Sequence, residues 1–257
     1  MPKTPSLVSR DQPRRNADDA SQMARAFVGV RELLMRGEFA RGERISELPM
    51  VARLGVSRTP IRLALERLAH IGFLDVVPTG GFAVRGFTIT EVLDAIEVRA
   101  VLEGTAARLA AERLTDVSEL SRLREYGSEM GALKRLTIDT LSEYMDLNEA
   151  FHAALVDLAK SAMLRRSIEQ VNSLPFASPS AMVFPTSVLP NSDETLAMAN
   201  VHHRSIIEAI GHRQGTRAES LAREHTFIAR RVLELAMSDT NALSRVPGGA
   251  LINISRT

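Results

Sequence analysis

The sequence GVSRTPIRLALERL, which runs from Gly55 to Leu68, joins a glycine turn to the start of an amphipathic helix. Arg58 and Arg62 lie four residues apart in the first turns of that helix. Positive charge is normally disfavoured at a helix N-terminus, because the helix dipole is positive there and attracts acids. The two arginines therefore have two interpretations: they belong to a solvated surface turn, or they bind a polyanion.

The residues around this helix predict two more helices ahead of it. Ser57 is a good N-cap, and the helix that it opens carries an apolar stripe. The stripe consists of Ile61, Ala64, Leu65, Leu68 and Ile71. Helical periodicity also predicts a helix from residue 21 to about Gly37, and a short helix from Ser46 to Leu54 that ends at a tight glycine turn.

After the third helix the apolar period changes towards two. Residues 73–77 and 82–85 flank the turn sequence PTGG, which predicts a β-hairpin. Three helices followed by a hairpin make up a winged helix-turn-helix. Residues 88–91 read TITE, a capping-box sequence, so the junction with the rest of the chain is expected at residues 86–90.

From this junction onward the pattern is helical. The predicted helices span 90–113, 116–134, 138–160, 161–173, 194–212 and 216–238. Residues 173–193, between the predicted helices 161–173 and 194–212, contain four prolines and are expected to form a long irregular connection.

We therefore expect a mostly α protein, in which a winged helix-turn-helix precedes an all-α antiparallel helical bundle. The expected boundaries are a flexible arm over 1–20, the winged helix over 21–87, the helical domain over 88–240 and a flexible tail over 241–257.

Composition narrows the class of protein. There are no cysteines among the 257 residues, which excludes disulfides and thiolate metal sites. No apolar run approaches the roughly 20 residues of a membrane span, and no signal-peptide pattern is present, so we expect a cytoplasmic protein without membrane contact. Residues 1–87 hold 14 Lys and Arg against 9 Asp and Glu, whereas the remainder holds 18 against 22. Only the first part is therefore expected to meet a polyanion.

A helix-turn-helix gives the arginine pair a chemical purpose. Its second motif helix enters the DNA major groove with its N-terminal residues first. Arginines at i and i+4 then face phosphates or guanine edges, and the hydroxyls of Ser57 and Thr59 add contacts. The small hairpin tip at residues 79–81 can approach the sugar-phosphate backbone closely.

The run RGERISELPMVARLGVSRTPIRLALERLAHIGFLDVVPTGGFAV, residues 41–84, resembles the DNA-binding domain of GntR-family bacterial transcription regulators. The segment LGVSRTPIR is its most specific part. The resemblance implies double-stranded operator DNA as the partner. It also implies a set of DNA-facing residues, with the two glycines at the wing tip: Ser57, Arg58, Thr59, Arg62, Gly80 and Gly81.

The sequence departs from the family pattern at two places. The family usually has an acid-arginine-acid run at the start of the second helix, whereas this chain reads Glu47-Leu48-Pro49. Because the missing arginine often reaches operator bases, Leu48 implies an altered operator preference or weaker binding. The wing also carries Thr79 where a basic residue is common.

Three of the six histidines are expected to point into the helical bundle. His152 shares a helix face with Asn148, and His203 lies on a face with isoleucines. His225 lies on an apolar face with Leu221, Ile228, Ala229 and Val232. Histidines on three helices can converge on a metal such as zinc, nickel, cobalt or iron. The alternative is three separate core histidines, each satisfied by its own hydrogen bond.

Residues 90–238 resemble the FCD effector-binding domain of the FadR subfamily of GntR regulators. The matching runs are AIEVRAVLEGTAARLAAERL, LNEAFHAAL, HRSIIEAI and LAREH. In many such domains these positions bind a divalent metal, here expected to be zinc or nickel. The resemblance assigns the metal ligands to Asn148, His152, His203 and His225. Asparagine, unlike the aspartate found in many relatives, brings no charge and should weaken metal binding.

An acidic effector would use the open positions on the metal. Arg99 is the candidate for a second contact with its carboxylate, because a guanidinium binds a carboxylate through two parallel hydrogen bonds. The alternative is an ion pair between Arg99 and its helix neighbour Glu103.

Together these features favour a ligand-responsive transcription regulator, a repressor by the habit of the family, that binds two operator half-sites as a homodimer. A small organic acid bound in the helical domain would shift the relative placement of the two DNA-binding units. The competing hypothesis is a metal-dependent enzyme built on the histidines, although no HExxH run or glycine-rich phosphate loop is present. A helical scaffold for another protein is a third class, which leaves the basic helix without a purpose.

Overall fold

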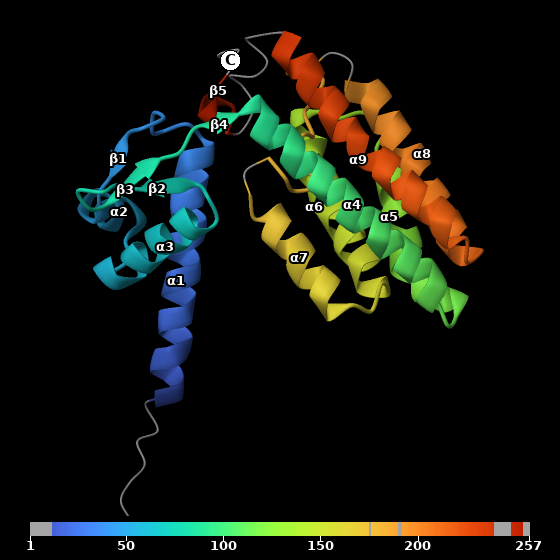
Figure 1. Ribbon diagram of the computed structural model, residues 1–257, viewed down its shortest axis with the longest axis horizontal. Coiled ribbons are helices and arrows are strands. Elements are labelled where there is room, and N and C mark those ends of the chain that lie inside the picture. Colours follow the sequence, from blue (N-terminus) through green and yellow to red (C-terminus); the bar gives the residue numbers. More distant parts are fainter. Residues whose placement is uncertain (1–11, 175, 190–191, 239–247, 254–257) are drawn as a thin grey trace, which may run out of the picture. The chain divides into compact units, whose positions relative to one another are not determined.

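The computed structural model describes residues 12–174, 176–189, 192–238 and 248–253. The chain divides into two compact units, Met1–Arg85 and Gly86–Thr257, whose helices and strands are labelled in Figure 1. The division falls at the start of the junction that the sequence predicts at residues 86–90.

The first unit is a winged helix-turn-helix, as predicted. Helices α1 and α2 pack against α3, and three short antiparallel strands form a sheet in the order β1-β3-β2. The helices are α1 (Gln12–Met35), α2 (Glu47–Leu54) and α3 (Arg58–His70), and the strands are β1 (Arg44–Ile45), β2 (Leu74–Val76) and β3 (Phe82–Val84). The predicted hairpin is β2–β3, with Leu74 opposite Val84.

The predicted apolar stripe of α3 forms much of this unit's core. All five residues of the stripe are buried: Ile61, Ala64, Leu65, Leu68 and Ile71. The turn before α3 depends on Gly55, which ends α2 in the left-handed conformation at φ +62°. That conformation is strained for residues with a Cβ, so glycine fixes where α2 stops and α3 begins.

Three details of this unit differ from the sequence prediction. Helix α1 begins at Gln12, so residues 12–20 are helical and not part of a flexible arm; residues 1–11 lie outside the described residues. Strand β1 was missed, because its two residues pair with Phe82 and Ala83, far along the chain. Ser57 occupies the N-cap position of α3 but makes no side-chain cap bond, since its hydroxyl contacts Oε1 of Gln22 at 3.3 Å instead.

The second unit contains the six predicted helices. They are α4 (Ile89–Arg113), α5 (Ser121–Ala132), α6 (Ile138–Leu158), α7 (Ala162–Asn172), α8 (Ser192–Gly211) and α9 (Gly215–Ser238), with a 3-10 turn, Val117–Leu120, ahead of α5. The capping box is present at the start of α4, where the Thr88 hydroxyl accepts from the Glu91 N–H and the Glu91 carboxylate accepts from the Thr88 N–H. No helix of the described residues is long and apolar enough to cross a membrane.

The tail was predicted to be flexible, and this was wrong for its described part. Residues 248–251 begin in a left-handed glycine and form a 3-10 turn, and β5 (Ile252–Asn253) pairs in parallel with β4 (Phe87–Thr88). Leu251 and Ile252 are buried, which supplies the apolar contact that holds this segment. Residues 239–247 and 254–257 lie outside the described residues.

Helices α4 and α9 pack closely because small residues line their contact. The alanines Ala107, Ala111, Ala218 and Ala222 are all buried. A Cβ added at Gly104 would lie 2.7 Å from Cγ of Arg223 and 3.2 Å from the backbone oxygen of Glu219. A side chain at this position therefore forces the helices apart.

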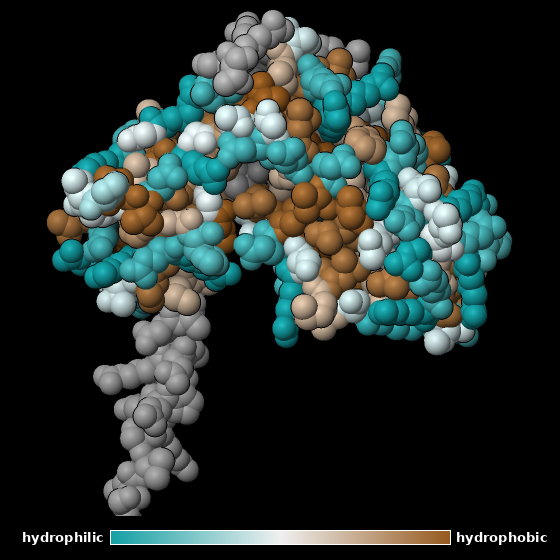
Figure 2. Space-filling view, viewed as in Figure 1, coloured by the Kyte–Doolittle hydropathy of each residue, from teal (hydrophilic) through white to brown (hydrophobic). Residues whose placement is uncertain are grey.

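Not all apolar residues of the second unit are buried. Figure 2 shows apolar side chains gathered over α7 and the neighbouring part of α4. Met163 on α7 and Val98 on α4 contribute to the exposed apolar surface of these two helices, with 71% and 48% of each residue accessible.

The close helix contact gives a stability prediction. We expect Gly104→Val to lower the free energy of unfolding by about 1–3 kcal/mol, because the added atoms overpack the contact between α4 and α9. Gly131 in α5 is a matched control, since a Cβ there meets nothing within 4 Å. Gly131→Val should change the free energy of unfolding by less than about 0.5 kcal/mol in urea denaturation followed by circular dichroism. Equal losses in the two variants would contradict the packing argument.

Candidate DNA-binding surface and metal centre

The residues predicted to face DNA lie at the exposed start of α3. Ser57, Arg58, Thr59 and Arg62 are all exposed. Arg58 and Arg62 leave 71% and 68% of their side chains accessible, so neither arginine serves the core.

Each arginine contacts an acid of the same unit. Arg58 Nε pairs with the Glu47 carboxylate, which links the start of α3 to the start of α2. Arg62 Nε donates to Glu66 Oε1 at 3.1 Å, one helical turn further on. Such exposed ion pairs contribute only about 0–1 kcal/mol, because water solvates both partners well. The two guanidinium groups are therefore held in place but remain available to a stronger anion.

The wing tip is a tight turn of two glycines. Gly80 and Gly81 have φ values of +94° and +86°, and a Cβ at either position meets nothing within 4 Å. The Val77 N–H donates to the Gly81 carbonyl at 3.0 Å and closes the turn. One basic group beside the wing was not predicted from the sequence. Arg44 of β1 donates to the Thr79 hydroxyl, so a guanidinium lies beside the wing although residue 79 is not basic.

The three histidines predicted to point inward meet in the second unit. His203 Nε2 lies 3.1 Å from His225 Nε2, which lies 3.3 Å from His152 Nε2. The three ligand atoms lie within 4.8 Å of one another, and all three side chains are buried. They come from α8, α9 and α6. The alternative of three separate core histidines, each with its own partner, does not describe this arrangement.

The Nε2 atoms of the three histidines face one another. Burial lowers the pKa values of His203 and His225 well below the ordinary histidine value, and the neighbouring imidazoles lower them further. Both rings are therefore neutral near pH 7, with one N–H each. The tautomer decides which of the facing Nε2 atoms carry a proton. With the protons on Nδ1, the Nε2 lone pairs all face the same place, where a cation can bind them. Neutral imidazole is also the form that binds metals.

Glu103 of α4 lies beside the Nδ1 atom of His152, and this contact was not predicted from the sequence. Its Oε2 lies 3.1 Å from His152 Nδ1, within ion-pair distance, although the ring N–H is not aligned for a full hydrogen bond. Burial raises the pKa of the Glu103 carboxyl, but the adjacent His152 and Arg99 outweigh that effect and lower the pKa to about 2. An ionised carboxylate at this place favours the proton on Nδ1 and leaves the Nε2 lone pair facing the other histidines.

Asn148 lies one turn before His152 on α6, and its orientation is set by Ser180. The Ser180 hydroxyl donates to the Met145 carbonyl at 3.1 Å, so its oxygen accepts from Asn148 Nδ2, also at 3.1 Å. This arrangement assigns the amide nitrogen to Ser180 and leaves the carbonyl Oδ1 as the atom that can coordinate a metal.

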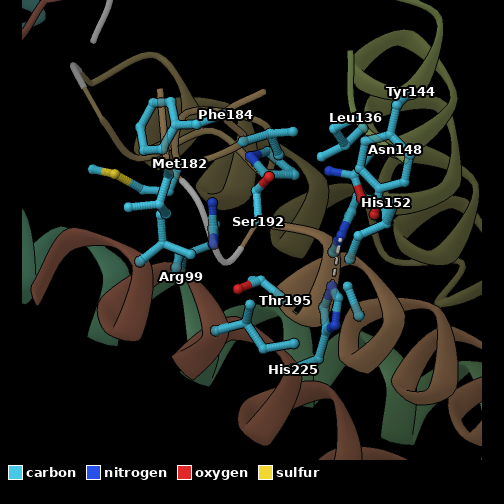
Figure 3. Close-up of a pocket in the computed structure, with 18 residues that line it drawn as sticks. Arg99, Leu136, Tyr144, Asn148, His152, Met182, Phe184, Ser192, Thr195 and His225 are labelled. Carbon is cyan, nitrogen blue, oxygen red and sulfur yellow. Dashed lines mark hydrogen bonds between the residues drawn. The ribbon is translucent and has the colours of Figure 1, made fainter. Parts of the chain in front are cut away.

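A cavity of about 60 Å³ adjoins the histidines, and Figure 3 shows the side chains around it. His152, His225 and Asn148 line one side, and Arg99 lies across from them, with Ser192 and Thr195 between. Tyr144 also lines the cavity, and burial raises the pKa of its hydroxyl, so it stays protonated. The cavity is thus built from α4, α6, α8, α9 and the irregular connection before α8.

Both interpretations of Arg99 describe part of its surroundings. Arg99 is 3% exposed, its Nη1 donates to the Ala177 carbonyl at 2.8 Å, and its Nε lies 3.8 Å from Glu103 Oε1. That separation is too long for a hydrogen bond, and Arg99 Nε has no hydrogen-bond partner. The arginine is therefore paired with Glu103 in charge and still has a donor to offer.

Sequence models of two protein domains match the chain. The model of the gntR family of bacterial regulatory proteins matches residues 24–84, and that of the FCD domain matches residues 94–227. The first match covers the winged helix and the second covers the helices that carry the histidines.

Individual proteins are also similar to the chain. It is 37% identical over 134 residues to the Nta operon transcriptional regulator of Aminobacter aminovorans, over 52% of this chain and 62% of that protein. It is 34% identical over 146 residues to the HTH-type transcriptional regulator YdhC of Bacillus subtilis, over 56% of this chain and 64% of that protein. The matches thus span less than two thirds of either relative.

A solved structure shares the fold. E. coli McbR/YncC has a TM-score of 0.62 and 21% sequence identity, with 84% of this chain and 98% of that chain covered. Since the FCD match spans half of the chain and the gntR match covers the winged helix ahead of it, the chain belongs to the GntR family of bacterial regulatory proteins, in the group that carries an FCD domain.

Proposed function

We propose that the protein is a ligand-responsive transcription regulator, a repressor of the FadR subfamily, that binds operator DNA as a homodimer. The observation that carries this proposal is the exposed arginine pair at the start of α3 in a winged helix. A guanidinium at this place can bind phosphate or the edge of guanine, and the wing tip can lie along the backbone. Two copies would place two such helices on half-sites about one DNA turn apart.

Leu48 supports the expectation of an unusual operator. It follows Glu47, the partner of Arg58, and is 68% exposed at the start of α2. A leucine offers no hydrogen bond to a base edge, so base recognition from α2 would differ from that of relatives with arginine there.

The arginine pair gives the first functional test. Arg58→Ala or Arg62→Ala should each weaken binding to the operator by about 1–3 kcal/mol. The double variant should lose sequence-specific binding altogether. Arg36→Ala is the matched control, because Arg36 forms an exposed i,i+4 pair with Glu32 like that of Arg62 with Glu66.

The operator would first be selected from genomic fragments with the unaltered protein, and binding would then be measured by fluorescence anisotropy over a salt series. Unchanged binding by both single variants would refute the assigned DNA surface.

We also propose that His152, His203 and His225 hold a divalent metal, zinc or nickel, with Asn148 Oδ1 as a fourth ligand. The support is the convergence of three buried imidazoles on one place, together with the carboxylate of Glu103 beside His152 Nδ1. A bound metal would act as a Lewis acid that holds a carboxylate at its open positions.

Arg99 would contact the same effector from across the cavity with its unpaired donor. Regulation then requires the effector to bind one arrangement of the DNA-binding units better than another, because a ligand with equal affinity for both shifts nothing.

The alternative of a metal-dependent enzyme has no support from the relatives. The matching domain models and the similar proteins are those of transcription regulators. The metal is therefore expected to bind an effector and not to catalyse a reaction.

Metal content tests the histidine cluster. Protein purified without a nickel column and then equilibrated with zinc should hold one ion per chain, and His203→Ala should lose it, because two imidazoles and an amide are too few ligands. His212→Ala is the control, since His212 is exposed in the turn after α8. Elemental analysis after dialysis gives the count, and equal zinc in both variants would refute the site.

The neutral ligand Asn148 gives an independent prediction. Asn148→Asp should raise zinc affinity by about tenfold or more, because a carboxylate adds a charge to a site of otherwise neutral ligands. Competition with a chromophoric chelator measures the affinity. A decrease in affinity would show that residue 148 does not contact the metal.

A further inference from the structure

The cavity beside the histidines is polar at two places and apolar over the rest of its wall. The polar groups are those of Arg99, Ser192, Thr195, Tyr144, Asn148 and the two histidines. The apolar wall consists of Leu136, Pro179, Met182, Val183, Phe184, Leu189, Leu196, Ala199, Ile228, Ala229 and Val232. Figure 3 shows Phe184 and Met182 on the side of Arg99, and Leu136 on the side of His152.

We propose that this cavity selects a short monocarboxylate with an aliphatic tail, and that Ser192 is one of the groups that bind its carboxylate. This rests on the proposed function, in which the cavity binds an acidic effector. It adds the chemical class of the acid and a further ligand-binding residue.

Ser192 is a donor without a partner in the described structure. It is 4% exposed, and its Oγ has no hydrogen-bond partner. Figure 3 places its hydroxyl between Arg99 and His152, where the oxygens of a carboxylate would lie. A buried hydroxyl without a partner is costly, so an anion at this place gains a hydrogen bond that the free protein lacks.

The rest of the wall disfavours more polar acids. Among the described residues that line the cavity, Arg99 is the one arginine or lysine and none is an acid. Glu103, which is not part of the lining, offsets part of the charge of Arg99. A second carboxylate, or the several hydroxyls of a sugar acid, would lie against aliphatic groups and lose hydration without replacement. An aliphatic tail instead gains from burial against Leu136, Phe184 and Val232.

The size of the cavity limits the tail. A water-sized group needs about 10–15 Å³ of such space, so 60 Å³ holds roughly four to six of them. The carboxylate takes part of this room, which leaves a tail of about two to four carbons. The tail of a longer acid must extend beyond this space, where it loses contact with the apolar wall.

The test uses the full, zinc-loaded chain and isothermal titration with acetate, propanoate, butanoate, 3-methylbutanoate, octanoate, succinate and gluconate. Affinity should rise about fourfold per methylene up to four or five carbons, since each buried methylene strengthens binding by that factor. It should then fall for octanoate, and succinate and gluconate should bind at least tenfold more weakly than butanoate. Tighter binding of succinate or gluconate than of butanoate would overturn the proposal.

Matched variants on α8 test the location. Ala199 lines the cavity, whereas Ala197, two residues earlier on the same helix, is exposed. Ala199→Leu should shift the preferred acid to a shorter chain, and Ala197→Leu should leave the preference unchanged. Ser192→Ala should weaken every acid of the series by a similar factor, about tenfold, without changing the preferred length. An unchanged preference in Ala199→Leu, or unchanged affinities in Ser192→Ala, would contradict the assigned cavity.

The proposed function is tested separately, by measuring zinc content and DNA binding in the absence of any acid. Retained metal and DNA binding with no chain-length preference would overturn the effector class alone. Loss of metal and DNA binding in the unaltered protein would instead overturn the proposed function on which it rests.

Discussion

Three buried imidazoles that face one another inside a helical unit are the constraint on which the rest of this unit depends. The Nε2 atoms of His203 and His152 lie 3.1 and 3.3 Å from that of His225, and all three side chains are removed from water. Burial of polar groups without partners costs free energy, so helices α6, α8 and α9 keep these side chains in contact only because the surrounding core is well packed. Phe151, fully buried and 4.3 Å from the His203 ring centroid, is part of that packing.

The two units use positive charge in opposite ways. Arg58 and Arg62 stand in water beside acids that hold them only weakly, which suits a surface that exchanges one anion for another. Arg99 is buried beside Glu103, where removing a charge from water is costly, so it suits a site that discriminates between small ligands. In the proposed function, the same residue type recognises a polyanion in one unit and a single carboxylate in the other.

The sequence predicted most of the helices because their signals are local. Apolar residues at helical spacing, the Thr88 capping box and the glycine at position 55 act within a few residues of themselves. The elements that were missed depend on distant partners: β1 pairs with β3, and β5 of the tail pairs with β4 at the start of the second unit. No pattern within two residues reveals such a pairing.

In the candidate site, too, local sequence signals predicted the features that lie within one helix and missed those that depend on distant partners. Helical periodicity predicted that His152, His203 and His225 point into the bundle. It could not predict the distances between rings on three different helices. From the sequence, Glu103 was considered only as an ion-pair partner of Arg99. In the structure its carboxylate also lies beside His152 Nδ1. Ser192 gave no signal, because a serine at a helix start is ordinarily a cap, and only the cavity reveals its unpaired hydroxyl.

X-ray absorption spectroscopy of the zinc-loaded protein tests the central claim most directly, because it reports the atoms around the metal itself. The account predicts a tetrahedral or five-coordinate ion with three imidazole nitrogens at about 2.0–2.1 Å and the remaining positions filled by oxygen. A shell of oxygen atoms without the outer scattering of imidazole rings would contradict it.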